Sequence, residues 1–281
     1  MMREFLFGES FSMHRLDGIN QLRAYIAGER ADGRRIAFVP TMGALHDGHL
    51  ALVRAGFVHA DVCIPYIFLN PKQFAAHEDL GKYPKTLAAD LEKLAGAGAS
   101  AVYVPQAAEI YPDGFAATVT VGGVSAPLEG EMRPHFFAGV ATVLTKMFLH
   151  ALPDAALFGE KDYQQLLVVK KLVRDLDFPV AVIGVETVRD ENGLALSSRN
   201  AYLSPEQYRV AIRMNKILAQ MDGRDDAWGA ARLIEAGFDS VDYCTMRDAD
   251  TLLPPDGGTR ARRALAAAWI GGTRLIDNLP I

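Results

Sequence analysis

Two histidines three residues apart, His46 and His49, are the side chains of this sequence best suited to chemistry on a phosphate. They follow a short apolar run at residues 36–39 and a loop at 41–47, and apolar residues at helical spacing come after them. Residues i and i+3 share a face of a helix start, so both imidazoles can lie beside the unpaired amides there. Those amides and the helix dipole favour an anion, and imidazoles add donors without the fixed charge of lysines. The pattern therefore predicts a phosphate site.

The same loop has three other interpretations. Gly43 and Gly48 have the spacing of a Walker A loop, but His49 and Leu50 stand where that motif has Lys and Ser or Thr, so we reject it. A zinc pair is disfavoured, because neither a Cys nor a third His follows at ligand spacing. Two solvated surface histidines that bind nothing remain the open alternative.

Polar residues follow three apolar runs that we expect to be strands, those ending at Val39, Leu69 and Phe158. Ligands of parallel sheets bind outside the carboxyl ends of the strands, so these three loops should converge. Lys161, in the third loop, can then reach a phosphate as a point charge. Arg199, in a later loop, can clamp a phosphate with its planar guanidinium.

Each of these later signals, taken alone, also fits ordinary structure. Lys161 and Asp162 could form a solvated ion pair, and Gln164 and Gln165 could lie on the surface. The residues at 197–199 could be a plain loop before a capped helix. The functional interpretation depends on the motifs occurring together.

The period of the apolar residues indicates the elements that must position these loops. Apolar runs alternate with segments of helical spacing over residues 16–185, which predicts an α/β fold with a parallel sheet covered on both faces. Pro65 falls within the expected strand at 61–69, where it cannot donate to a ladder, so we expect a bend or a sheet edge there. We expect helices at 16–27, 48–56, 87–96, 139–150 and 166–176, and strands at 36–39, 61–69, 101–104, 118–121, 155–158 and 180–185.

The pattern changes after Val185, where a turn signal at 190–193 is followed by a capped helix. Ser204 and Gln207 form a capping box, and Pro205 stands at the first helical position. We therefore divide the chain near residue 186. The expected parts are an appendage at 1–12, an α/β domain at 13–185 and a smaller α+β domain at 186–281, the last with helices at 204–221 and 228–236 and strands at 241–246 and 263–269.

The composition is that of an ordinary globular protein and limits the classes of partner. Half of the residues are hydrophobic, the net charge is -5 and the pI is near 5.8, so no electrostatic footprint for nucleic acid or a membrane surface is visible. No apolar segment approaches the ~20 residues of a membrane span, and residues 1–12 do not have the pattern of a signal peptide. Cys63 and Cys244 lie far apart, which is typical of unpaired thiols in a reducing cytoplasm.

The chain carries four motifs in one order: Pro40–His49, Asn70–Phe74, Phe158–Gln165 and Leu196–Asn200. Together they resemble the pantothenate synthetase family over about residues 13–278. The resemblance implies a Rossmann-type nucleotide-binding domain, a lid-like C-terminal domain and a homodimer. It also implies ATP-dependent condensation of pantoate with β-alanine through a pantoyl adenylate, which releases AMP and pyrophosphate and yields a coenzyme A precursor.

The resemblance further implies roles for individual residues. His49 stands where the family has its proton donor, and His46, Lys161 and Arg199 complete the expected catalytic set. Gln73 would hold both pantoate and β-alanine, and Gln165 would hold pantoate. Apart from the resemblance, Asn70 is three residues before Gln73, so we expect it at the substrate as well. The implied ATP site consists of Met42, Gly43, Ala44, Leu45, His46, Asp47, Gly48, His49, Gly159, Glu160, Lys161, Asp162, Val188, Leu196, Ser197, Ser198 and Arg199.

One stretch departs from the family pattern. Phe136 stands where the family usually has a histidine, and His135 lies one place earlier. This keeps open an alternative in the same class, an adenylating ligase or nucleotidyltransferase that acts on another small carboxylic acid. A nucleotide-binding regulator without catalysis is a second alternative, against which the two histidines, Lys161 and Arg199 argue.

The implied chemistry joins one anion to another at the α-phosphorus of ATP, so donors and cations must surround the phosphates. We expect no dedicated protein metal site, but a hydrated Mg²⁺ that bridges the phosphates, with Asp162 as a weak candidate ligand. Neutral hydrogen bonds from Gln73 and Gln165 suit a small hydroxy acid such as pantoate. No base for the β-alanine amine is evident, so proximity is expected to carry that step.

Overall fold

The computed structural model describes residues 13–74, 79–81, 83–84 and 86–281, and the appendage expected at 1–12 lies outside these residues. The strands are β1 (His14–Leu16), β2 (Ile36–Thr41), β3 (Val62–Ile67), β4 (Ala101–Tyr103), β5 (Ala155–Gly159), β6 (Ala181–Val185), β7 (Ser240–Asp248), β8 (Arg262–Ile270) and β9 (Thr273–Pro280). The α-helices are α1 (Ile19–Ala31), α2 (Asp47–His59), α3 (Leu87–Gly96), α4 (Ala107–Ile110), α5 (Glu129–Met132), α6 (Phe136–Ala151), α7 (Tyr163–Asp175), α8 (Pro205–Ala211), α9 (Arg213–Leu218) and α10 (Asp226–Ala236). The 3₁₀ turns are η1 (Pro71–Gln73), η2 (Asp79–Gly81), η3 (Glu160–Asp162) and η4 (Ser198–Tyr202).

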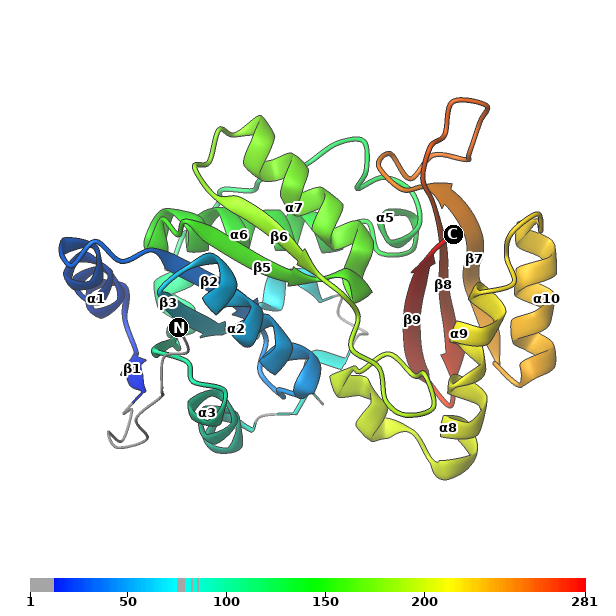
Figure 1. The fold of residues 1–281 in the computed structure, drawn as a ribbon, viewed down its shortest axis with the longest axis horizontal. Coiled ribbons are helices and arrows are strands. Elements are labelled where there is room, and N and C mark those ends of the chain that lie inside the picture. The colour runs from blue at the N-terminus through cyan, green and yellow to red at the C-terminus, as the bar shows by residue number, and fades with distance from the viewer. Residues whose placement is uncertain (1–12, 75–78, 82, 85) are drawn as a thin grey trace, which may run out of the picture.

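The described strands form two separate sheets (Figure 1). The larger has six described strands in the order β1-β4-β3-β2-β5-β6, with every neighbouring pair parallel. In the smaller one, β7, β8 and β9 are antiparallel, and α8, α9 and α10 lie beside it (Figure 1). This architecture confirms the predicted Rossmann-type sheet with a smaller C-terminal α+β part.

Alternate residues of the central strands contribute to two separate hydrophobic cores. Ile36 and Phe38 of β2 pack in one core with residues of α1, α6 and α7. Ala37 and Val39 pack in the other core with residues of α2 and α3. Because both faces of the strand are buried, its sequence is a continuous apolar run rather than an alternating one. Helices thus cover both faces of the sheet, and the loops at the strand ends extend beyond it.

Helix α2 approaches the sheet closely because of Gly56. A Cβ added at this position would lie 2.7 Å from the Sγ of Cys63 on β3. The glycine therefore serves packing and does not end the helix, which continues to His59, three residues beyond the expected end. This close contact packs the C-terminal half of α2 against the sheet.

The expected helix at 16–27 begins too early. Leu16 belongs to β1, where it pairs with Tyr103 of β4, and the helix starts at Ile19. The amide of Ile19 donates to Glu109 Oε1 at 2.7 Å, which satisfies one of the helix-start donors. Leu16 is buried, as a core residue of a helix would be, and it lies at helical spacing from Ile19 and Leu22. The spacing of apolar residues therefore did not separate β1 from α1.

The strand expected at 118–121 is absent from the described sheets. The amide of Val119 donates instead to Thr142 Oγ1 of α6 at 2.9 Å. Val119 and Val121 pack against the core shared by α1, α6 and α7. The segment is apolar because it covers a helix, not because it pairs with a strand.

Pro65 lies in an interior strand, so the expectation of a sheet edge is wrong. Cys63, two residues earlier, bonds to Ser100 on the β4 side through both its N–H and its carbonyl oxygen. Residues two apart in a strand face the same way, so the nitrogen of Pro65 also faces β4. All six residues of β3 pair with β2, whereas only Tyr66 pairs with β4, at Tyr103. The proline therefore lies on the side of β3 where the pairing is sparse.

The C-terminal part differs from the prediction in two ways. The helix expected at 204–221 is interrupted at Ile212, giving α8 and α9, although the predicted capping box of Ser204 and Gln207 is confirmed. Strand β9 was not predicted at all. Gly271 and Gly272, both with positive φ, form the two-residue hairpin that joins it to β8.

A small apolar cluster joins the two parts of the molecule. Leu128 and Leu167 pack there with Leu252 and Leu265 of the C-terminal part. Figure 1 shows α5 between α7 and the three-stranded sheet. Within the described ranges, no helix combines the length and the apolar character needed to cross a membrane.

Candidate active site

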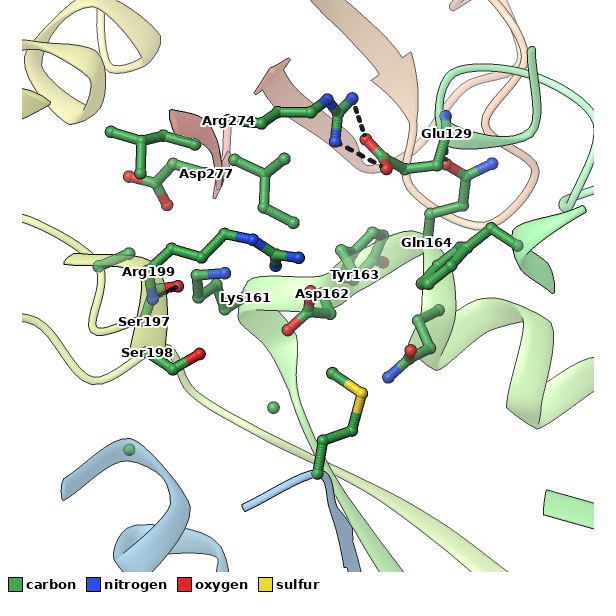
Figure 2. Close-up of a pocket in the computed structure, with 18 of the residues that line it drawn as sticks. Glu129, Lys161, Asp162, Tyr163, Gln164, Ser197, Ser198, Arg199, Arg274 and Asp277 are labelled. Carbon is green, nitrogen blue, oxygen red and sulfur yellow. Dashed lines mark hydrogen bonds and ion pairs between the residues drawn. The ribbon is translucent and has the colours of Figure 1, made fainter. Parts of the chain in front are cut away.

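A cavity of about 1110 Å³ lies between the two parts of the molecule, at the carboxyl ends of β2, β3 and β5. The three loops after these strands converge there, as expected for a parallel sheet. Figure 2 shows the start of α7 on one side of the cavity and the loop that carries Ser197, Ser198 and Arg199 on the other. The predicted site residues that line it are Met42, His46, Gly48, His49, Asn70, Gln73, Gly159, Lys161, Asp162, Gln165, Val188, Leu196, Ser197, Ser198 and Arg199.

The other predicted residues do not line the described cavity wall; these are Gly43, Ala44, Leu45, Asp47 and Glu160. Ala44 and Leu45 face α3, because their amides donate to the carboxylate of Asp90 at 2.9 and 2.8 Å. Glu160 points toward β8, where its carboxylate pairs with Arg263 at 3.1 Å. Ala44, Leu45 and Glu160 thus bond to elements outside the cavity.

Asp90 is the residue that organises the loop before α2, and we did not predict it. It is 1% exposed and also accepts a hydrogen bond from Thr86 Oγ1 at 3.0 Å. Lys93 reinforces the arrangement by donating to the carbonyl oxygen of Leu45 at 2.6 Å. The sequence holds a signal, since Asp90 is a charged residue on the same helical face as Leu87 and Leu94. The amides of Ala44 and Leu45 are thus already bonded, whereas the side chains of His46 and His49 line the cavity.

His46 and His49 lie ring against ring at the start of α2, with centroids 4.1 Å apart. The backbone N–H of His46 donates to Nδ1 of His49 at 3.3 Å. A neutral imidazole that accepts at Nδ1 carries its proton on Nε2, so this tautomer is assigned from the hydrogen bond. His49 therefore offers an N–H donor from Nε2.

Both imidazoles are neutral at physiological pH. Burial, and then the nearby cation of Lys161, lowers the pKa of His46 from 6.5 to about 4. Burial, and then the neighbouring His46 and Lys161, lowers the pKa of His49 to about 3. The pair can donate hydrogen bonds to a phosphate oxygen but brings no formal charge.

The cations come from two other loops. Lys161 lies on η3, directly after β5, and Arg199 lies on η4. Lys161 makes no side-chain ion pair with any described residue, although Asp162 follows it in sequence. The Oγ of Ser197 caps η4 by accepting from the amide of Arg199 at 3.3 Å, and the Ser198 hydroxyl contacts Tyr83 OH at 3.1 Å.

Gln73 lies on the β3 side of the cavity, where Asn70 holds it in place. Asn70 Nδ2 donates to Gln73 Oε1 at 3.0 Å and to the carbonyl oxygen of Gly139 at 3.2 Å. Asn70 Oδ1 in turn accepts from Tyr111 OH at 2.7 Å. Gln73 Nε2 contacts the sulfur of Met42 at 3.0 Å, a weak acceptor that a better ligand can displace. Asn70 thus orients the amide that faces the cavity.

Phe136, the residue that departs from the family pattern, stacks on Arg133 in the cavity wall. The guanidinium carbon lies 3.9 Å from the ring centroid, a cation–π contact. Arg133 Nη2 also donates to the carbonyl oxygen of Gln73 at 3.2 Å. Phe136 therefore helps to hold the backbone at Gln73 through Arg133.

A buried ionic network closes the cavity toward the C-terminal sheet, and we did not predict it. Arg274 of β9 donates to both oxygens of Glu129 at 2.7 and 2.9 Å, as Figure 2 shows, and its Nε donates to Asp242 at 2.7 Å. Tyr243 OH donates to Glu129 Oε1 at 2.8 Å. Gln164 belongs to this wall, because its Oε1 accepts from the amide of Glu129. These groups are far apart in sequence, so spacing gave no signal.

The described residues contain no group of three or more His, Cys, Asp or Glu side chains able to hold a metal ion. Asp162 is the carboxylate in the cavity wall nearest in sequence to Lys161, and it makes no cap hydrogen bond with α7. One carboxylate fits a Mg²⁺ ion that keeps several waters and takes its other ligands from phosphates.

Comparisons with known proteins agree with this geometry. The family model for pantoate-beta-alanine ligase matches residues 14–280. The pantothenate synthetase of Mesorhizobium japonicum is 52% identical over 275 residues, which cover 95% of this chain and 97% of that protein.

Solved structures give the same result. The pantothenate synthetase of Thermus thermophilus is 42% identical, with a TM-score of 0.87 over 95% of this chain and 99% of that one. A pantoate-beta-alanine ligase from Francisella tularensis, complexed with beta-gamma ATP and beta-alanine, is 32% identical, with a TM-score of 0.83 over 96% and 98% of the two chains. The chain therefore belongs to the pantoate–β-alanine ligase family.

Proposed function

We propose that this chain condenses pantoate with β-alanine at the expense of ATP, in two steps that share the cavity between its two parts. The observation that carries the proposal is the meeting of His46, His49, Lys161 and Arg199 in one cavity with the amide of Gln73. The family match and the relatives named above support the overall reaction. We assign residues 13–185 to nucleotide binding and residues 186–281 to a lid-like second domain.

In the first step a carboxylate oxygen of pantoate attacks the α-phosphorus of ATP, and pyrophosphate leaves. Lys161 and Arg199 offset the repulsion between the two anions. The Nε2 proton of His49 faces the charge that builds on the α-phosphate oxygens, and such a donor contributes ~3 kcal/mol. His46 adds a second neutral donor. The product is a pantoyl adenylate held in the cavity.

The pantoate subsite lies near Gln73 and Gln165. Both amides offer a donor and an acceptor, which suits a hydroxy acid with a carboxylate. Asn70 contributes indirectly, since its own groups are already bonded to Gln73 Oε1 and to Tyr111. The Gln165 side chain lines the cavity without a hydrogen bond to any described residue, so it can adapt to the substrate.

In the second step the amine of β-alanine attacks the acyl carbon of the adenylate, and AMP leaves. No described side chain is an evident base for this amine. Proximity, which contributes up to ~7–11 kcal/mol, accounts for most of the acceleration. The cavity serves this step by holding the adenylate and the amine together.

A Mg²⁺ ion, held by the ATP phosphates, water and Asp162, would supply further positive charge at the phosphates. We further propose that the chain works as a homodimer, as its family resemblance implies, and in the cytoplasm, as its two unpaired cysteines suggest. Light scattering after gel filtration tests the dimer directly, because a monomer mass would contradict it.

Pantoate-dependent exchange of labelled pyrophosphate into ATP tests the first step, since it requires reversible adenylate formation. We expect exchange with ATP, Mg²⁺ and pantoate, and none when pantoate is left out. Exchange that requires a different small carboxylic acid would assign the chain to another adenylating enzyme. ATP binding without exchange for any acid would indicate a non-catalytic nucleotide-binding protein.

A further inference from the structure

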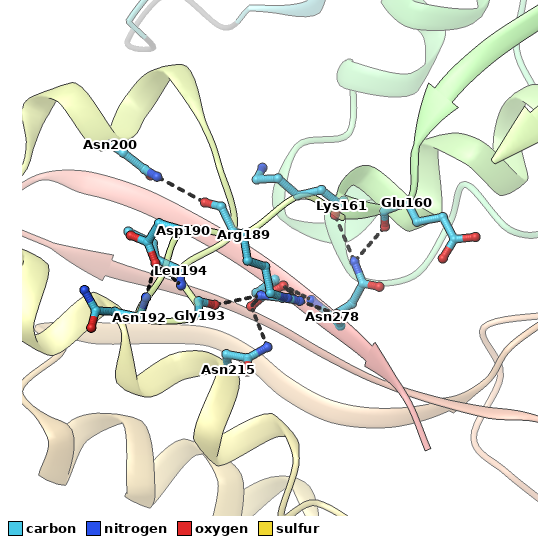
Figure 3. Close-up of polar contacts among 12 residues, drawn as sticks. Glu160, Lys161, Arg189, Asp190, Asn192, Gly193, Leu194, Asn200, Asn215 and Asn278 are labelled. Atoms are coloured by element: carbon cyan, nitrogen blue, oxygen red, sulfur yellow. Dashed lines mark hydrogen bonds and ion pairs between the residues drawn. The ribbon is translucent and has the colours of Figure 1, made fainter. Parts of the chain in front are cut away.

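The turn that carries Lys161 is held by a residue of the C-terminal sheet. Asn278 of β9 donates from Nδ2 to the carbonyl oxygens of both Glu160 and Lys161, each at 2.9 Å. Figure 3 shows the single amide reaching the two consecutive carbonyls. Asn278 is only 3% exposed, so these bonds are shielded from water. Two hydrogen bonds to adjacent carbonyls restrain the position and the rotation of η3.

Arg263 of β8 fixes the orientation of the Asn278 amide. Its Nη1 donates to Asn278 Oδ1, which leaves Nδ2 turned toward η3. Its Nη2 donates to Glu160 Oε2 at 3.1 Å, and its guanidinium carbon lies 3.7 Å from the ring centroid of Tyr163. Arg263 therefore contacts Glu160, just before Lys161, and Tyr163, the first residue of α7.

The neighbouring residue of β9 holds the opposite loop. Asp277 accepts from Arg189 Nη1 and Nη2 at 2.7 and 2.9 Å. Arg189 Nη1 also donates to the carbonyl oxygen of Gly193 at 3.1 Å, within the hairpin that leads to Arg199. Two adjacent residues of one strand thus anchor the two loops that carry the cations.

We propose that Asn278 is a positioning residue for Lys161, coupling the C-terminal sheet to the cation that faces the phosphates. The proposal rests on the role of Lys161 in the proposed function. A lysine ammonium on a flexible four-carbon stem gives a defined charge position only when its backbone is restrained. Misplacement of a catalytic group by about 1 Å can cost 10²-fold in rate, so loss of the restraint should be measurable.

The test is a double-mutant cycle on pyrophosphate exchange. Asn278→Ala removes both donors, and Asn278→Asp removes them while keeping the size and the acceptor for Arg263. We expect each to lower the exchange rate at saturating substrates by roughly tenfold or more, with KM for pantoate changed by less than about twofold. In a Lys161→Ala background the same changes should cost less than about twofold, because the group they position is gone.

Asn20→Ala is the control, since Asn20 is an exposed asparagine of α1 that does not line the cavity. It should leave the exchange rate unchanged. The proposal would be overturned if the Asn278 variants lowered the exchange rate equally in the parent chain and in the Lys161→Ala background. It would also be overturned if neither Asn278 variant lowered the rate in the parent chain. Should Asn278→Ala fail to fold, as judged by its melting temperature, Asn278→Asp decides. A Lys161→Ala variant with an unchanged rate would instead contradict the proposed role of Lys161 itself.

Discussion

The Nδ1 atom of His49 accepts a hydrogen bond from the backbone N–H of His46, across the first turn of α2. This contact closes the helix start on itself and uses up one nitrogen of the ring. The remaining nitrogen, Nε2, then carries the only proton of a neutral imidazole. The direction of that donor is set by the helix rather than by the substrate.

Replacement of His49 by alanine should slow adenylate formation by at least about tenfold, because one preorganised donor to the α-phosphate is lost. Pyrophosphate exchange measures this step. His59→Ala, at the far end of the same helix and outside the cavity, is the control and should keep its rate. An unchanged rate in His49→Ala would remove His49 from the mechanism.

Protein stability should fall as the pH is lowered from 6.5 toward 4. The imidazole of His46 titrates at 6.5 in the unfolded chain but at about 4 in the folded one, so the unfolded state binds its proton first. This difference in pKa lowers the free energy of unfolding by about 3 kcal/mol at pH 4, compared with its value above pH 6.5. It vanishes above pH 6.5, where both states are neutral.

His46→Gln removes this contribution, since glutamine does not titrate, and it also removes the part of the His49 pKa shift that His46 causes, which changes the pH dependence in the same direction. The loss of unfolding free energy between pH 8 and pH 4, measured by urea denaturation, should be smaller in the variant than in the parent chain. His150, whose pKa burial also lowers to about 4, is present in both proteins and cancels. Equal losses in the two proteins would mean that His46 is not buried as a neutral ring.

Gln73→Ala should raise KM for pantoate much more than KM for ATP. The Gln73 amide lies at the β3 end of the cavity, whereas the groups that we propose to bind phosphate come from α2, η3 and η4. Steady-state kinetics with each substrate varied in turn measures the two constants. Gln220→Ala, an exposed glutamine of the C-terminal part, controls for the substitution itself. Equal increases for both substrates would refute the assignment.

Arg274→Ala should lower the free energy of unfolding by about 3–5 kcal/mol, because it leaves the buried carboxylate of Glu129 without its main partner. Urea denaturation measures the loss. The exposed pair of Arg209 and Glu206 is the control, and Arg209→Ala should cost less than about 1 kcal/mol. Similar costs for the two variants would show that Glu129 is not shielded from water.

The N-terminal fold could be predicted largely because its central strands are buried on both faces. Their apolar runs stand out from the amphipathic helices between them, and the loops at their ends carry the motifs. The failures arise where a residue serves tertiary packing. Leu16 is buried in a strand but has helical spacing, Gly56 is packed against Cys63 rather than ending a helix, and Val119 covers α6.

Strand β9 was missed for a different reason. Its sequence includes Asp277 and Asn278, which are polar yet 5% and 3% exposed, so the strand lacks an apolar pattern. Their partners lie in loops about 80 to 120 residues away, since Asp277 accepts from Arg189 and Asn278 donates to the carbonyl oxygen of Lys161. Asp90 was missed although it lies on the apolar face of its helix. The role of such buried polar residues cannot be predicted from sequence, because their hydrogen-bond partners become neighbours only in the folded chain.

The paired contacts of Asp277 and Asn278 also limit how an enzyme of this architecture can change. A recombination event that exchanged the C-terminal sheet for another of the same shape would preserve the nucleotide-binding fold. It would, however, leave the loops of Arg189 and Lys161 without their hydrogen-bond partners. New acid specificities should therefore arise by point substitutions around Gln73 rather than by shuffling of modules.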